Sequence, residues 1–66
     1  MKRKDLIREL EKLGWYLKRH GGNHDVWTND LDIEPVERHK EISDSLVKKI
    51  LKRAKLSNSR KGDQND

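Results

Sequence analysis

The stretch WYLKRHGGNHDVWTN, residues 15–29, decides the fold, because two short runs of strand-forming residues flank two glycines and an asparagine. A three-residue loop that contains glycine is typical of a β-hairpin, and we expect one of the loop glycines to adopt a positive φ. In the first run, residues 15–20, alternation predicts a half-buried strand. Its faces would carry Trp15 and Leu17 on one side and Tyr16, Lys18 and His20 on the other.

The residues on either side of the hairpin predict the other elements. Before it, an apolar stripe at helical spacing ends at Gly14, a natural C-terminal stop. After it, LDIEPVER at 31–38 predicts a third strand, which Pro35 places at an edge of the sheet or at a bulge. Ser43 is a candidate N-cap for a last helix. The two helical stripes are Leu6, Ile7, Leu10 and Leu13, and Leu46, Val47, Ile50, Leu51 and Ala54.

The predicted order is helix, strand, strand, strand, helix. The economical packing for this order is an α+β domain over residues 1–56, with a three-stranded antiparallel sheet and both helices on one of its faces. This is the topology of the double-stranded-RNA-binding domain. Residues 57–66 contain no apolar side chain, and we expect them to form a disordered polar tail.

Composition limits what the protein can be. A chain of 66 residues, 30% hydrophobic and 42% charged, excludes a large enzyme with a deep pocket. It has no cysteine and no apolar run resembling a signal peptide or a membrane span, so we expect a cytoplasmic protein. The net charge of +4 suits a phosphate-rich partner, although a solvated helix face gives the same charge.

Histidine is the side chain that titrates near neutrality without help, and His24 sits where the loop meets the second strand. RNA hydrolysis requires a base for the ribose 2′-OH, an acid for the leaving 5′ oxygen and cations for the phosphate. His24 is a candidate catalytic acid or base, and an ordinary surface hairpin is the alternative. Candidate RNA-binding residues are Lys18, Arg19, Gly22 and Asn23 near the hairpin and Lys48 and Lys52 on the last helix.

Other conspicuous side chains have simpler interpretations. Trp15 and Trp27 could stack on bases, but a chain this poor in aromatic residues is expected to bury them. His20 and His39 lack the spacing of metal ligands, so a structural or solvent-exposed role is expected, and no metal or other cofactor is required.

Residues 14–27, GWYLKRHGGNHDVW, and residues 36–56, VERHKEISDSLVKKILKRAKL, together resemble the HicA family of bacterial toxins. These are small mRNA interferases with the double-stranded-RNA-binding fold. The resemblance implies that His24 occupies the catalytic histidine position and that a HicB antitoxin covers it in a hetero-oligomer. Matching positions are Gly14, Trp15, Arg19, Gly22, His24 and Trp27, then Arg38, His39, Ile42, Leu46, Ile50, Leu51, Lys52 and Leu56.

The chain departs from the family pattern at three places. Asn23 stands where serine is commonest, Glu37 where proline is usual, and Lys55 where glycine usually precedes the final leucine. Without that glycine, the last helix is expected to run straight on. The sheet region is also acidic, and acids facing His24 would repel RNA. These acids are Asp25, Asp30, Asp32, Glu34 and Glu37.

The sequence therefore predicts the toxin of a type II toxin–antitoxin pair, an endoribonuclease that cleaves mRNA and inhibits translation. An alternative from another class is a non-catalytic RNA-binding module of the same fold. A third is a protein-interaction module, or a degraded toxin that retains only antitoxin binding. Loss of function without loss of fold on changing His24 to alanine would distinguish the first from the others.

Overall fold

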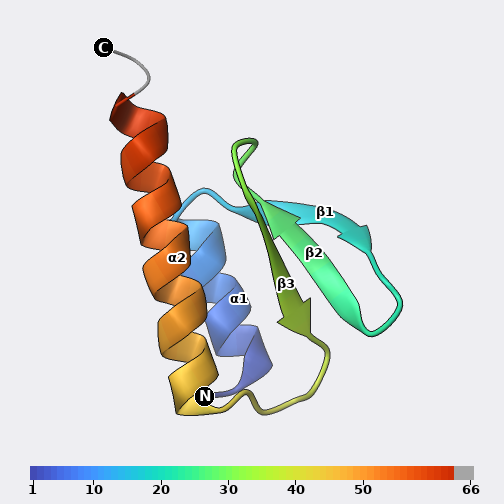
Figure 1. Ribbon diagram of the computed structural model, residues 1–66. Helices are drawn as coiled ribbons and strands as arrows, with labels where there is room; N and C mark the ends of the chain where they lie inside the picture. The colour runs from blue at the N-terminus through green and yellow to red at the C-terminus, as the bar shows by residue number, and fades with distance from the viewer. Residues whose placement is uncertain (64–66) are drawn as a thin grey trace.

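The structure, a computed structural model, describes residues 1–63, with side chains described through residue 60. Its elements follow the predicted order, and the three strands form an antiparallel sheet in the order β1-β2-β3 (Figure 1). The elements are α1 (Arg3–Lys12), β1 (Tyr16–His20), β2 (His24–Thr28), β3 (Ile33–Glu37) and α2 (Asp44–Asp63).

Helix α1 ends where its sequence predicts. Gly14 has a φ of +87°, in the left-handed region that glycine adopts without strain. Its N–H donates to the carbonyl of Glu11, and the N–H of Trp15 donates to that of Leu10, both at 3.0 Å. This pair of bonds is a Schellman motif, which closes the helix and turns the chain into β1.

Strand β1 differs from the predicted alternation. Leu17 pairs with Trp27, but the next pair joins Arg19 to Val26, so Lys18 is an extra residue in the ladder. This bulge reverses the faces beyond it and sets His20 opposite Asp25.

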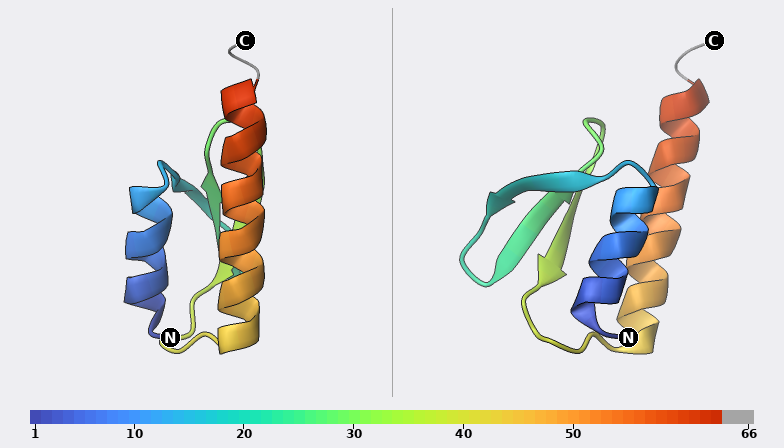
Figure 2. Two further views of the ribbon diagram at one scale, coloured as in Figure 1. Left: turned by 90° about the vertical axis from the view of Figure 1, so that its left-hand side faces the viewer. Right: turned by 180° about the vertical axis from the view of Figure 1, so that it is seen from behind.

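The prediction that the first strand is half-buried is also wrong, because all five residues of β1 are exposed. The strand lies at an edge of the sheet, and its hairpin with β2 projects away from the helices (Figures 1 and 2). Strand β3 is the other edge of the sheet, as Pro35 indicated. Proline has no N–H to donate, and an edge strand has one side on which no ladder bond is needed.

The core lies between the sheet and the two helices, which form one layer on one face of it, as predicted (Figure 2). Ser43 caps α2, because its Oγ accepts from the N–H of Leu46 at 3.4 Å. Both tryptophans are buried, as expected. The buried apolar residues are Leu6, Leu10, Trp15, Trp27, Val36, Ile42, Val47, Ile50 and Ala54.

Helix α2 runs on past Lys55 and Leu56, as the missing glycine indicated, and continues to Asp63. The prediction of a disordered tail is therefore wrong for residues 57–63, whereas residues 64–66 lie outside the described residues.

Polar contacts explain why the helix continues. Ser57 is 3% exposed and its Oγ accepts from Asn29 at 2.8 Å. The Asn58 amide accepts from the Trp15 indole N–H at 3.2 Å and donates to the carbonyl of Leu13 at 2.7 Å. These residues satisfy buried polar groups of the domain, a role that an apolar pattern cannot reveal.

Candidate active site

His24 is the first residue of β2, so its side chain projects from strand backbone rather than from the tip of the loop. It is exposed, and it pairs across the sheet with Glu37, the last residue of β3. An open groove of about 380 Å³ lies at these two strand ends. It is lined by Asn23, His24, Glu37, Arg38 and His39.

The loop before His24 folds back onto the backbone of β2. The N–H of Gly21 donates to the His24 carbonyl at 2.8 Å, and a Cβ on Gly21 would lie only 2.5 Å from that oxygen. A Cβ on Gly22 would meet nothing within 4 Å. The expected positive φ in this loop is wrong, since Gly14 alone among the described glycines has one. Gly21 is needed for close approach instead.

The buried carboxylate of Asp25 links the segments that surround the groove. Asp25 is 6% exposed, and its oxygens accept from Arg3 Nη2 at 2.6 Å, Arg38 Nε at 2.8 Å and His20 Nδ1 at 2.8 Å. Because an ionised carboxylate only accepts, the proton of the last bond belongs to His20. His20, and then Arg38, lower the pKa of the Asp25 carboxyl to about 2.

Arg38 fastens the hairpin loop to the chain that leaves β3. Besides its bond to Asp25, its Nη1 donates to the carbonyl of Gly22 at 3.1 Å and its Nη2 donates to that of Gly21. Arg3 braces the same strand end, because its Nε donates to the carbonyl of Glu37 at 2.8 Å. Asp25 thus joins α1, the hairpin and the end of β3 in one ion-pair network.

The structure places a second histidine in the groove of His24. The His39 side chain is 78% exposed, as expected, and its Nε2 lies 3.8 Å from the Glu37 carboxylate. His20 has the expected structural role through Asp25. Two imidazoles in one groove provide two groups for proton transfer to or from a bound substrate.

The predicted RNA-binding residues fall into separate places. Asn23 lines the groove of His24, with Gly22 exposed beside it, and Lys18 and Arg19 are exposed on β1. The structure does not bring Lys48 and Lys52 to His24. These two lysines line another groove on α2, together with Leu51, Lys55 and Leu56.

The acids of the sheet region are mostly held by partners. Glu34 is buried and its Oε1 accepts from Arg53 Nε at 3.1 Å; Asp32 pairs with Arg60. Ser57 and Arg60 lower the pKa of the Asp32 carboxyl. Asp30 accepts from the Tyr16 hydroxyl, a bond that raises the pKa of Tyr16. Among these acids, Glu37 is the one that lines the His24 groove.

Sequence reasoning missed Arg3 and did not assign Arg38 or His39 to the site. Arg38 and His39 follow β3 directly, which could have marked them as neighbours of the hairpin once strand pairing was assumed. Nothing local marks Arg3, which reaches Asp25 from 22 positions away in the chain.

Fold and groove together define a small α+β protein with two histidines at one end of its sheet. The chain belongs to the HicA toxin family of bacterial toxin–antitoxin systems. The model of this family, described as "HicA toxin of bacterial toxin-antitoxin", matches residues 3–56. Neither the curated proteins nor the solved structures gave a match.

In residues 1–63, neither helix has the length and hydropathy needed to cross a lipid bilayer. Over the same part of the chain, no group of three or more His, Cys, Asp and Glu side chains is placed to hold a metal ion.

Proposed function

We propose that this protein is an endoribonuclease that cleaves mRNA and so inhibits translation, with His24 as a catalytic acid or base. The observation that carries the proposal is that His24 and His39 line one open groove. Membership of a toxin–antitoxin family supports it. The antitoxin of such a pair would cover the His24 groove in a hetero-oligomer, in the cytoplasm where mRNA is found.

The chemistry needs only groups that the groove contains. The ribose 2′ oxygen attacks the phosphorus and loses its proton to one imidazole, while the bond from phosphorus to the 5′ oxygen breaks and that oxygen takes a proton from the other. His24 serves one transfer and His39 the other. No step requires a metal or an organic cofactor.

In this proposal Arg38 binds the phosphate. A guanidinium has five N–H groups, and Arg38 uses one each from Nε, Nη1 and Nη2 in the bonds to Asp25, Gly22 and Gly21. One N–H on each terminal nitrogen is left over for a phosphate oxygen. Because its position is already held, this cation can stabilise the negative charge that grows in the transition state without reorganising.

Cleavage of a defined single-stranded RNA by the wild type and by His24→Ala tests the proposal. We expect the variant to lose about a hundredfold to ten-thousandfold in rate, the range of general acid–base catalysis. Circular dichroism and RNA binding establish that the variant is folded and still binds. Binding without cleavage by the wild type would favour the non-catalytic RNA-binding module instead, and equal cleavage by both proteins would remove His24 from the mechanism.

A further inference from the structure

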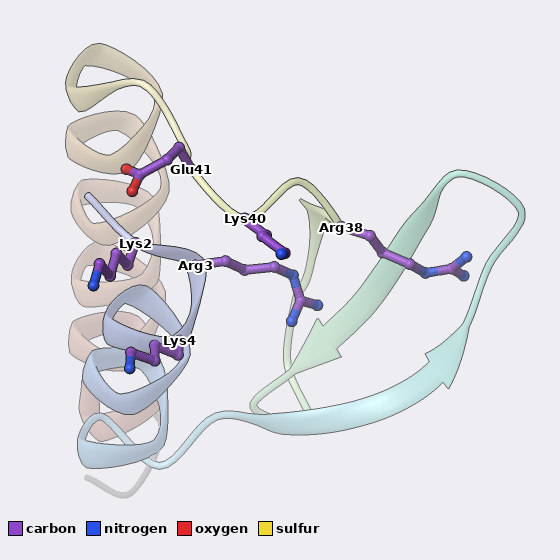
Figure 3. Close-up of a pocket in the computed structure, with 6 residues that line it drawn as sticks. All are labelled: Lys2, Arg3, Lys4, Arg38, Lys40 and Glu41. Atoms are coloured by element: carbon purple, nitrogen blue, oxygen red, sulfur yellow. The ribbon is translucent and has the colours of Figure 1, made fainter.

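A second pocket adjoins the groove of His24 and shares Arg38 with it. It has a volume of about 520 Å³ and is lined by five cationic side chains and one carboxylate (Figure 3). The lining residues are Lys2, Arg3, Lys4, Arg38, Lys40 and Glu41. We propose that this basic pocket binds the phosphate backbone of the RNA strand beside the cleaved bond, so that the strand continues from it into the groove of His24.

Backbone pairing between two distant segments builds the basic pocket. Lys2 forms an isolated antiparallel bridge with Glu41. The N–H of Arg3 donates to the carbonyl of Lys40 at 2.8 Å, and the N–H of Ile42 donates to that of Met1 at 2.9 Å. The cations at the beginning of α1 and those that precede α2 are therefore held on neighbouring segments of the chain.

Both arginines of the basic pocket are fixed before any ligand arrives. Arg3 and Arg38 each bind the buried Asp25 carboxylate, so they carry two positive charges against its single negative charge. Fixed donors lose little conformational freedom when a phosphate binds them.

The lysines of the basic pocket carry charge that no acid described in residues 1–60 neutralises. Lys2, Lys4 and Lys40 are exposed, and they form no ion pair or side-chain hydrogen bond with the side chains described, residues 1–60. In Figure 3 the tip of Lys40 lies near Arg3, Arg38 reaches toward the hairpin, and Lys2 and Lys4 extend the other way from the beginning of α1. Charge distributed over such a length suits a row of phosphates better than one small anion.

The location of the basic pocket favours RNA over an acidic protein segment. Arg38 lines both the basic pocket and the His24 groove, so a strand bound at one reaches the other. The groove on α2, with Lys48, Lys52 and Lys55, shares no residue with the His24 groove. These three lysines offer a matched comparison with the same number of charges.

The inference rests on the proposed function, and a binding assay tests it separately. We would measure the affinity of a single-stranded 2′-O-methyl oligoribonucleotide by fluorescence anisotropy at several salt concentrations. This RNA lacks the 2′-OH nucleophile, so it binds without being cut. The proteins are the wild type, a variant with Lys2→Gln, Lys4→Gln and Lys40→Gln, and a control with Lys48→Gln, Lys52→Gln and Lys55→Gln.

We expect the basic-pocket variant to bind the RNA about a hundredfold more weakly near 0.1 M salt. The slope of log Kd against log salt should fall by about 2, because each lost single-strand phosphate contact lowers it by roughly 0.7. The control should stay within about threefold of the wild type, because its lysines line a groove that shares no residue with the basic pocket or the His24 groove. Thermal unfolding should show that both variants are folded.

Other outcomes overturn the inference in distinguishable ways. A larger loss of RNA affinity in the α2 control would show that the RNA binds along α2. Unchanged affinity of both variants would show that the basic pocket does not bind the phosphates. Either result leaves the proposed function intact if the wild type still cleaves RNA through His24. Loss of binding to an acidic antitoxin segment, with RNA binding unchanged, would make the pocket a protein interface.

Discussion

The Nε of Arg38 donates to the Oδ1 of Asp25 at 2.8 Å, and this bond ties the chain after β3 to the strand that begins with His24. The same carboxylate holds Arg3 at the start of α1. One buried acid thus positions two cations that line the basic pocket, and one of them also lines the His24 groove. Asp25 therefore fixes the positions of Arg3 and Arg38.

The charge of Asp25 makes folding stability depend on pH in the acid range. Its pKa is about 2 in the folded protein against an ordinary 3.8, so ionised Asp25 stabilises the fold above about pH 4. That stabilisation is lost as the pH falls from about 4 through 2. We expect urea midpoints of the wild type to fall over this range and those of Asp25→Asn to fall less. Asp5→Asn, which changes an acid at 3.8 Å from Arg8, is the control. Parallel curves for wild type and Asp25→Asn would contradict the role of the network.

The two histidines of the groove predict a matched pair of activity losses. His39→Ala should lose about a hundredfold to ten-thousandfold in RNA cleavage, as we expect for His24→Ala, because each variant removes one proton transfer. The double variant should lose much less than the product of the two, since both act in one step. Full activity of His39→Ala would assign the second transfer to another group.

The glycines of the hairpin loop predict opposite results for the same substitution. Gly21→Ala should destabilise the fold by about 1–3 kcal/mol and reduce cleavage, because its Cβ would lie 2.5 Å from the His24 carbonyl oxygen and displace that strand end. Gly22→Ala meets open space and should remain within about 0.5 kcal/mol of the wild type. Urea unfolding and RNA cleavage check both, and equal effects would show that the close approach is unimportant.

The last turns of α2 predict that truncation is costly. Ending the chain at Leu56 removes the hydrogen bonds that Asn58 makes with the Trp15 indole and the Leu13 carbonyl. At about 0.5–1.5 kcal/mol for each bond, with more for a buried group left unpaired, the loss should be roughly 2–4 kcal/mol. Asn58→Ala removes the same two bonds and should reproduce most of this loss, and Asn58→Asp, which retains the acceptor, should lose less. Undiminished stability of the truncated chain would restore the domain boundary at Leu56.

Local pattern determined the order of the elements and most of their bounds. Apolar spacing predicted both helices, Gly14 ended the first, Ser43 capped the second and Pro35 placed β3 at an edge. These signals are local because backbone conformation and amphipathic faces depend on neighbours within a few residues. The hairpin likewise put His24 at the start of the second strand, as its sequence predicted.

Only the tertiary structure decided how the groove is assembled. The bulge at Lys18 sets His20 opposite Asp25. Arg3, 22 positions away in the chain, binds the same carboxylate. Asn58 became part of the fold because its amide meets the Trp15 indole, whereas its own neighbours are polar. Such contacts join residues far apart in the chain, and a charged or amide side chain has the same local signature whether it finds a buried partner or water.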